Sequence, residues 1–308
     1  MLRAVVLGAA GFIGRHVTAA LTQGSQPVDV LRLGRSGGGG PSDRHVRLDL
    51  TRVPVEELAA VLRTFAPDAV VNCVGAMSGP ARVLFEANTV AVDTLLHAVA
   101  LGAPAARVVQ LGSAAEYGAT GPGRPIREDK CPRPLSAYGI SKLAATQLVS
   151  EAHASGRVDA VVLRVFNPIG PGQPTATVLG RAAAAIKEAV AAGAATVKLG
   201  PLEAFRDFVD VRDVARAVTC AIRTARPGRV VFNVARGEAI QVREMVRRLA
   251  EHAGFPGGID ERAVGSARSG AVAWQEADVE NAAIGLGWVP RFELDASVRG
   301  VWETYDAA

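Results

Sequence analysis

The sequence predicts an α/β protein with a doubly wound parallel sheet and a smaller, mixed C-terminal lobe. Two observations predict the sheet. Short apolar runs alternate with stretches of helical apolar spacing from residue 2 to residue 166, which is typical of parallel strands joined by crossover helices. The first strand also runs through a glycine-rich turn directly into a helix. Beyond residue 167 the alternation loosens, which predicts the second lobe.

The glycine-rich turn is the first junction of the chain. Residues 2–7 form a mostly apolar run, and residues 15–21 have the spacing of a helix. Gly8 allows a tight turn, Gly11 lets the backbone approach a pyrophosphate, and Gly14 lets the helix pack closely on the strand. Unpaired N–H groups at the helix N-terminus would then meet the phosphates. We expect a dinucleotide here, and the alternative is a turn that binds nothing. The residues expected at the pyrophosphate are Gly8, Gly11, Phe12, Ile13 and Gly14.

The other elements follow in chain order. Further strands are expected at 28–33, 45–50, 68–75, 107–112, 158–166 and 230–234, and a flexible glycine-rich loop at 37–42. Helices are expected at 54–65, 81–101, 136–153, 177–192, 211–225, 241–253 and 294–306. Right-handed crossovers would bring the carboxyl ends of the strands to one edge, where ligands bind. We therefore expect a dinucleotide-binding domain from residues 1–167 and about 209–235, and a substrate lobe from 168–208 and 236–308.

Composition narrows the class of protein. Of 308 residues, 49% are hydrophobic and 21% are charged, which is typical of a globular chain. No apolar run reaches the about 18 residues of a membrane span, and the first run is a core strand. The three cysteines and five histidines lack the spacing of a metal site. Arginines are dispersed, with a net charge of +4. We expect a cytoplasmic enzyme with anionic ligands and neither metal, membrane nor nucleic acid.

The tip of the second expected strand bears on the choice of cofactor. An acidic residue there commonly holds the 2′-hydroxyl of NAD, but this sequence has Gly34 and Arg35. Arg35 and Arg15 could bracket a 2′-phosphate, which favours NADP over NAD. The alternative is that both arginines are solvated surface residues. Asp49, with Leu50 beside it, is placed to meet the adenine amino group, unless Asp49 is a helix cap.

Three residues have the chemistry of a reductase. Ser113 ends the fifth expected strand, and Tyr138 and Lys142 lie four residues apart on the following helix, hence on one helix face. A neighbouring ammonium stabilises a phenolate, so Tyr138 could exchange a proton with a substrate oxygen that Ser113 also hydrogen-bonds. The alternative is an ordinary exposed Tyr and Lys.

With these motifs the chain resembles the short-chain dehydrogenase/reductase superfamily, extended type, over nearly its whole length. The resemblance implies a Rossmann-type fold with the catalytic residues Ser113, Tyr138 and Lys142, a cofactor contact at Asn88 and a substrate contact at Asn167. The segments that carry it are Gly8–Gly14, Asn88, Ser113–Gly118, Tyr138–Lys142, Arg164–Gly172 and Arg206–Ala215. The last two are most familiar in enzymes that act on nucleotide-activated sugars.

The resemblance also indicates which reaction to expect. Related dehydratases and decarboxylases carry acidic residues just after the serine of the triad, where this chain has Ala114 and Ala115. Simple carbonyl reduction needs only the triad. We therefore expect an NADPH-dependent ketoreductase of a nucleotide-linked (deoxy)hexose, acting as a homodimer. The alternatives are a nucleotide-sugar 4-epimerase with bound NAD, a reductase of a non-sugar, polyketide-type ketone, and a dinucleotide-sensing regulator without turnover.

Two arginines are expected at the substrate's diphosphate. In resembling enzymes the arginine of the Arg-Asp-Phe segment, here Arg206, faces the diphosphate, and Arg268 stands where those enzymes often present an Arg-Pro pair. Each would be a phosphate clamp. The alternative for Arg206 is an ion pair with Asp207 or Asp210 that braces the second lobe.

Overall fold

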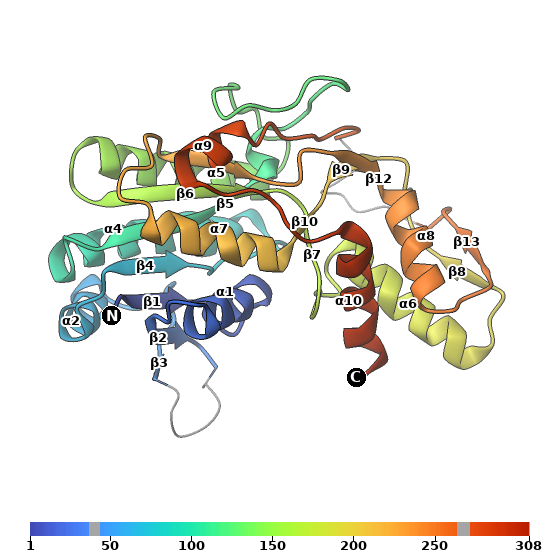
Figure 1. Ribbon diagram of the computed structural model, residues 1–308, viewed down its shortest axis with the longest axis horizontal. Coiled ribbons are helices and arrows are strands. Elements are labelled where there is room, and N and C mark those ends of the chain that lie inside the picture. The colour runs from blue at the N-terminus through green and yellow to red at the C-terminus, as the bar shows by residue number, and fades with distance from the viewer. Residues whose placement is uncertain (37–43, 264–271, 308) are drawn as a thin grey trace.

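Seven parallel strands form the central sheet of the protein, in the spatial order β11-β6-β5-β4-β1-β2-β3 (Figure 1). This computed structural model describes residues 1–36, 44–263 and 272–307, so the loop expected at 37–42 lies outside the described residues. The doubly wound parallel sheet confirms the predicted fold class. Its strands are β1 (Arg3–Leu7), β2 (Asp29–Gly34), β3 (His45–Arg47), β4 (Ala69–Asn72), β5 (Arg107–Ser113), β6 (Asp159–Val165) and β11 (Val231–Val234).

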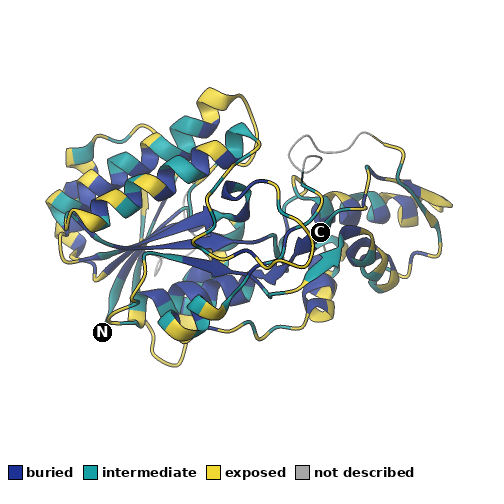
Figure 2. Ribbon diagram, turned by 90° about the horizontal axis from the view of Figure 1, so that it is seen from above, coloured by how far each residue is buried: buried dark blue, intermediate teal, exposed yellow. Residues whose placement is uncertain are grey.

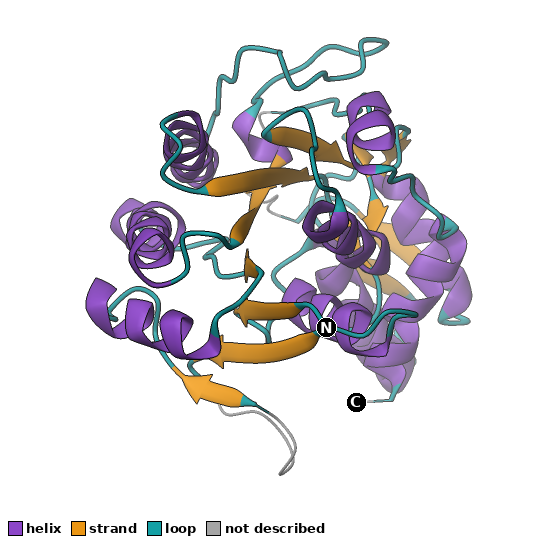
Figure 3. Cartoon of the chain, turned by 60° about the vertical axis from the view of Figure 1, so that its left-hand side comes forward, coloured by secondary structure: helices purple, strands orange, loops and turns teal. Residues whose placement is uncertain are grey.

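Helices cover both faces of this sheet (Figure 3). Side chains alternate along each strand, so Val5 of β1 packs in one core layer and Val6 in the other. Figure 2 shows the buried strands between helices whose outer faces are exposed. One layer contains α2 (Val55–Phe65), α4 (Ala91–Gly102) and α5 (Ala137–Ala154), and the other contains α1 (Phe12–Gln23) and α7 (Val211–Arg223).

The third helical stretch, over residues 81–102, has a π-helical turn in its middle. The short helix α3 (Ala81–Phe85) continues through the π-turn Glu86–Val90 into α4. The continuous helix over 81–102, with a mean hydropathy of 1.3, is long and apolar enough to span a membrane by length and composition alone. Its side chains Leu95 and Val99 lie in the core between α2 and the sheet, however, as in a core helix.

A second lobe stands beyond the carboxyl ends of the strands. It consists of α6 (Val178–Ala192), α8 (Val242–His252) and α10 (Leu294–Asp306) with two small sheets, and Ile186, Met245 and Val298 lie in its own apolar core. The small sheets are β8 (Thr196–Lys198) with β13 (Gly258–Asp260) and β9 (Phe205–Asp207) with β12 (Ala239–Gln241). A third pair, β7 (Pro168–Ile169) and β10 (Val209–Asp210), lies where the chain leaves and re-enters the first domain.

One segment lies elsewhere than the expected domain division places it. The helix α9 (Glu280–Leu286) and the fully buried Trp288 pack with α7 and β11 on the first domain, although we expected 236–308 to belong to the lobe. The indole Nε1 of Trp288 donates to the carbonyl oxygen of Asp213 in α7 at 2.9 Å. The C-terminal part of the chain thus contributes apolar side chains to the packing on this face of the central sheet.

Candidate active site

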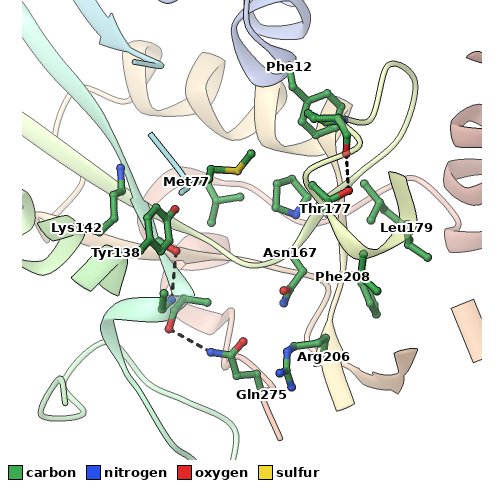
Figure 4. Close-up of a pocket in the computed structure, with 18 of the residues that line it drawn as sticks. Phe12, Met77, Tyr138, Lys142, Asn167, Thr177, Leu179, Arg206, Phe208 and Gln275 are labelled. Atoms are coloured by element: carbon green, nitrogen blue, oxygen red, sulfur yellow. Dashed lines mark hydrogen bonds between the residues drawn. The ribbon is translucent and has the colours of Figure 1, made fainter. Parts of the chain in front are cut away.

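A cavity of about 740 Å³ separates the carboxyl ends of the central strands from the second lobe. The sheet side is lined by the turn after β1, the ends of β4, β5 and β6, and the start of α5. The lobe side is lined by the start of α6 and by residues 199–208. Figure 4 shows Tyr138 and Lys142 on one side of this cavity, with Leu179 and Phe208 on the other. Residues that are distant in the sequence therefore face one shared cavity of a size typical of ligand sites.

The glycine turn has the geometry that its sequence predicts. Gly8 has φ +72°, a left-handed conformation that favours glycine. A Cβ added at Gly14 would lie 2.1 Å from the carbonyl oxygen of Gly8, so the helix can approach the turn only because no side chain is there. Gly11 is exposed at the N-cap of α1 and lines the cavity with Phe12 and Ile13. The helix N-terminus thus presents a cradle that a side chain would fill, and a pyrophosphate fits it.

The Tyr138 and Lys142 pair lies at the start of α5. Ser136 caps this helix by accepting a hydrogen bond from the N–H of Gly139 at 3.1 Å. Lys142 is 6% exposed, and its Nζ donates to the carbonyl oxygen of Leu111 at 2.6 Å. Burial lowers the pKa of Lys142, and the nearby carboxylate of Glu116 opposes that shift. The structure therefore holds an ammonium one helical turn from the half-buried phenol of Tyr138.

Ser113 is the last residue of β5 and faces the same cavity. Its Oγ accepts a hydrogen bond from the N–H of Ala115 at 3.2 Å. Ala114 and Ala115 also line the cavity. Among the described residues that line it, none is Asp or Glu. The wall around Ser113 can donate hydrogen bonds to a substrate oxygen, but it offers no carboxyl group to remove a substrate proton.

Asn88 braces the wall of the cavity from within the π-turn. Its Oδ1 accepts from the N–H of Ala76 at 2.9 Å, and its Nδ2 donates to the carbonyl oxygen of Ala76 at 2.9 Å and to Oγ of Ser141 at 3.0 Å. The amide is thus occupied by the loop after β4 and by α5. Asn88 itself lines the cavity and also supports the two neighbouring segments of its wall, so its expected contact with the cofactor stays a prediction. Such π-turns are frequent at functional sites.

The expected ribose end lies at the tips of β2 and β3. Arg35 is exposed there, whereas the guanidinium of Arg15 donates to the carbonyl oxygen of Gly172 and lies 5.7 Å from the ring centroid of Phe12. In this structure Arg15 is therefore held by the Gly172 carbonyl oxygen, while Arg35 is exposed. Asp49 closes a turn rather than capping a helix, since its Oδ1 accepts from N and Oγ1 of Thr51 at 3.0 and 2.7 Å. These hydrogen bonds lower the pKa of Asp49. Leu50 beside it is buried.

The expected substrate contacts lie on the lobe side. Asn167 donates from Nδ2 to the carbonyl oxygen of Asp207 at 2.9 Å. Arg206 is 6% exposed, and its guanidinium donates at 2.7 Å to the carbonyl oxygens of Phe205 and Val272 while lining the cavity. Burial lowers the pKa of Arg206 to about 10, still high enough to keep its charge near neutral pH. Arg268 lies outside the described residues.

The neighbouring carboxylates have partners other than Arg206. Asp207 accepts hydrogen bonds from the backbone N–H groups of Arg236, Gly237 and Ala277. Asp210 accepts from the guanidinium of Arg212 at 2.7 Å and from Oγ of Ser297 at 2.6 Å. These contacts weaken the alternative in which Arg206 serves as the ion-pair partner of either carboxylate.

The cavity has further lining residues that the sequence did not single out, and Gln275 and Thr177 are two polar ones. Gln275 is 6% exposed, lines the cavity, and donates from Nε2 to the carbonyl oxygen of Ala114 at 3.2 Å (Figure 4). It lies in an irregular segment, where no periodic signal identifies an inward side chain. Thr177 caps α6 by accepting from the N–H of Gly180 at 3.1 Å. A threonine directly before a helical run was the available signal for this second residue.

Comparison with known proteins gives a consistent result. The model of the NAD dependent epimerase/dehydratase family matches residues 4–235. The dTDP-6-deoxy-L-talose 4-dehydrogenase (NAD(P)(+)) of Kitasatospora kifunensis is 40% identical over 99% of this chain and 96% of its own length. A UDP-glucose 4-epimerase of Azospirillum brasilense is 33% identical over 98% of this chain and 92% of its own. The solved structure of RMD from Pseudomonas aeruginosa complexed with NADPH has a TM-score of 0.85 and 26% identity, over 100% of this chain and 99% of its own.

Proposed function

Because the chain belongs to the NAD-dependent epimerase/dehydratase family of short-chain dehydrogenases/reductases, we propose that it is an NADPH-dependent ketoreductase of a nucleotide-linked deoxyhexose. One observation carries the choice of reaction. Ser113, Tyr138 and Lys142 line a cavity to which no described lining residue contributes a carboxyl group. Reduction requires one proton donor and a hydride, whereas the dehydratases and decarboxylases of this family also use an acidic side chain. The 40% identity to a dehydrogenase of a nucleotide-linked 6-deoxyhexose agrees with this.

Three residues of this site have separate roles in proton transfer to the substrate. The glycine turn of Gly8, Gly11 and Gly14 would hold NADPH, which would supply a hydride to the substrate carbonyl carbon. Tyr138 gives its phenolic proton to the carbonyl oxygen, and Ser113 donates a hydrogen bond to the same oxygen. The Lys142 ammonium stabilises the phenolate that remains. Because Lys142 is buried against the Leu111 carbonyl, its charge stands at a fixed place relative to the phenol.

We also propose that the protein prefers NADPH to NADH. The supporting observation is Arg35, exposed at the tip of β2 where an acidic residue would favour NAD. Arg15 contributes less to this preference than the sequence led us to expect, since its guanidinium holds the Gly172 carbonyl. The solved structure of RMD from Pseudomonas aeruginosa, which is complexed with NADPH, supports the same choice.

Arg206 is the proposed clamp for the substrate's diphosphate. Its guanidinium is buried at the lobe side of the cavity and oriented by two backbone carbonyls, which leaves the planar group fixed before any ligand arrives. A fixed guanidinium suits the geometry of phosphate oxygens. Asn167 and Gln275 lie on the same wall (Figure 4).

The second candidate is a nucleotide-sugar 4-epimerase with retained NAD, which the 33% identity to a UDP-glucose 4-epimerase favours. Native mass spectrometry of the purified protein separates the two, because an epimerase recycles its cofactor and would retain NAD. The decisive assay mixes the protein with NADPH and a dTDP-linked 4-keto-6-deoxyhexose and follows absorbance of the nicotinamide. Stoichiometric oxidation of NADPH supports the reductase. Retained NAD with interconversion of UDP-hexoses and no NADPH oxidation would show the epimerase instead.

A homodimer remains part of the proposal. Val83, Val90 and Ile140 are apolar and 40%, 56% and 46% exposed, and they lie on the adjoining segments α3, the π-turn and α5. A second copy of this chain would cover such a face. Light scattering during size exclusion should give twice the chain mass, and Ile140→Arg should shift it toward the monomer. An unchanged monomeric mass for the wild type would exclude the dimer.

A further inference from the structure

A buried ion pair stands directly behind Ser113. Glu116 follows β5 in a short 3₁₀ turn, Arg164 comes from the neighbouring strand β6, and Nε of Arg164 lies 2.7 Å from Oε2 of Glu116. The side chains are 0% and 4% exposed, and neither residue lines the cavity. Glu116 belongs to the segment Ser113–Gly118, one of those that carry the family resemblance. The structure directs it away from the cavity and into the protein.

The other oxygen of the carboxylate holds Ser113. Oε1 of Glu116 accepts a hydrogen bond from the backbone N–H of Ser113 at 2.7 Å, while Oγ of Ser113 accepts from the N–H of Ala115. The two contacts form a reciprocal capping box. They fix both the backbone and the hydroxyl oxygen of Ser113. With Ala115 donating to that oxygen, the hydroxyl proton remains available for donation into the cavity.

Gly112 permits Glu116 and Arg164 to lie this close to the strand, because it has no side chain. A Cβ added at Gly112 would lie 2.8 Å from Oε1 of Glu116 and 3.2 Å from Cγ of Arg164. On the far side, the guanidinium carbon of Arg164 lies 4.5 Å from the ring centroid of Tyr117. Burial raises the pKa of Glu116, and Arg164 and the Ser113 N–H oppose that shift.

Stability alone is a weak reason for such a pair. Desolvation of two charges offsets much of their attraction, so apolar residues of similar volume commonly stabilise a core as well or better. The contact of Glu116 with the backbone of a residue that lines the cavity gives the pair a second role.

We propose that Glu116 is a positioning residue for Ser113: its carboxylate, held by Arg164, fixes the Ser113 backbone so that Oγ–H points at the substrate's carbonyl oxygen. This inference rests on the proposed function only in assigning Ser113 to the reaction, and 4-epimerisation would use Ser113 in the same way. Glu116 acts through Ser113 and touches neither substrate nor cofactor.

The same two strands supply a matched control. Arg107 of β5 pairs with Asp159 of β6 at the opposite end of the strand pair, with Nε to Oδ2 at 2.8 Å. Asp159→Asn therefore removes one carboxylate charge from an ion pair that bridges β5 and β6 far from the cavity. If Glu116 only ties the two strands together, both neutralisations should act on stability and leave turnover alone.

The test is a double-mutant cycle on Ser113→Ala and Glu116→Gln. Glutamine keeps the shape and an acceptor oxygen but lacks the charge. We expect Glu116→Gln to lower kcat about tenfold, with the KM for NADPH unchanged, and Asp159→Asn to leave kcat within about twofold. Ser113→Ala should lower kcat about 10²-fold. Adding Glu116→Gln to Ser113→Ala should then change kcat less than about twofold, since the group it positions is gone.

Two results would overturn the inference. In one, the reductions in kcat caused by Ser113→Ala and Glu116→Gln multiply independently in the double mutant. In the other, Glu116→Gln leaves kcat as little changed as Asp159→Asn does. Should Glu116→Gln fail to fold, Arg164→Lys, which keeps the charge near Glu116, takes its place in the same cycle with the same expected coupling. The cycle is measured on whichever reaction the wild type catalyses, keto reduction or 4-epimerisation. Absence of NADPH oxidation by the wild type therefore refutes the proposed function, whereas additivity refutes the role of Glu116.

Discussion

Gly14→Ala should destabilise the protein, although alanine favours helices. An added Cβ would lie 2.1 Å from the Gly8 carbonyl oxygen, 2.8 Å from its carbonyl carbon and 2.9 Å from Cα of Ala9. All three are backbone atoms of a turn that β1 and α1 hold on both sides, so α1 must move away by roughly 1 Å to restore an ordinary contact. Overpacking of this kind typically costs about 1–3 kcal/mol, against a gain of about 1 kcal/mol from helix propensity. Because the contacts are with backbone atoms that cannot rotate away, the cost should lie in the upper part of that range, about 2–3 kcal/mol, and the net loss should be about 1–2 kcal/mol.

Gly11→Ala is the matched substitution with a different outcome. Gly11 has φ −71° and ψ 172°, which any residue adopts, and its Cβ would meet only the Gly8 carbonyl oxygen at 3.2 Å. Stability should therefore change by less than about 1 kcal/mol. The methyl group would stand where the backbone meets the pyrophosphate, so NADPH affinity should fall at least about tenfold, which is about 1.4 kcal/mol.

The two variants are compared by urea unfolding without cofactor and by calorimetric titration with NADPH. The reasoning assigns the loss of stability to Gly14 and the loss of binding to Gly11. It is refuted if Gly14→Ala unfolds at the wild-type urea concentration, because α1 would then not depend on the close approach. Wild-type NADPH affinity of Gly11→Ala would refute the placement of the pyrophosphate.

Four further outcomes are expected. Tyr138→Phe should lower kcat about 10²-fold or more with NADPH affinity retained, and unchanged turnover would remove Tyr138 from the mechanism. Arg35→Ala should cancel a preference for NADPH over NADH of about 1.5–3 kcal/mol in titrations, whereas Arg44→Ala, whose guanidinium is held by Asp29 at 2.8 Å, should keep it. Arg206→Gln should raise the KM for the nucleotide sugar at least about tenfold without weakening the binding of NADPH. It should also lower the free energy of unfolding by about 1 kcal/mol, because two backbone carbonyls lose a hydrogen-bond donor. An unchanged KM would exclude the clamp. Burial raises the pKa of Asp207 to about 7. Between about pH 4 and pH 7 the folded state therefore keeps a proton that the unfolded state has lost, so the free energy of unfolding falls as the pH rises through this range. Between pH 5 and pH 8, urea unfolding should show this loss, about 2–3 kcal/mol, in the wild type and not in Asp207→Asn.

The sequence determined the first domain and the chemistry of its site. The central strands are continuous apolar runs because both faces of the sheet are covered, and each run ends at a turn, so their positions along the chain could be predicted. Ser113, Tyr138 and Lys142 could be named because two are one helical turn apart and the third ends a strand on the ligand side of the sheet. These signals come from residues that are close together in the chain, and a periodic pattern reveals such local spacing.

Short elements could not be predicted in this way. The strands β7 to β10, β12 and β13 have two or three residues each, too few to show an alternating pattern, and each exists through its pairing partner. The third strand was expected over 45–50, but only His45–Arg47 pairs with β2. In the same way Trp288 carries no sequence signal that it packs on α7 rather than in the lobe.

Tertiary structure alone decided what the polar residues near the site do. The sequence did not show that the Arg15 side chain donates to the Gly172 carbonyl oxygen, or that the Asn88 amide holds Ala76 and Ser141. The partner of Glu116 is Arg164, which is 48 residues away in the chain, on the neighbouring strand. A buried charge or amide takes whichever complementary group the fold brings within hydrogen-bonding distance, because an unsatisfied one costs too much free energy. That group is set by strand order and packing, which the local sequence around each residue does not contain.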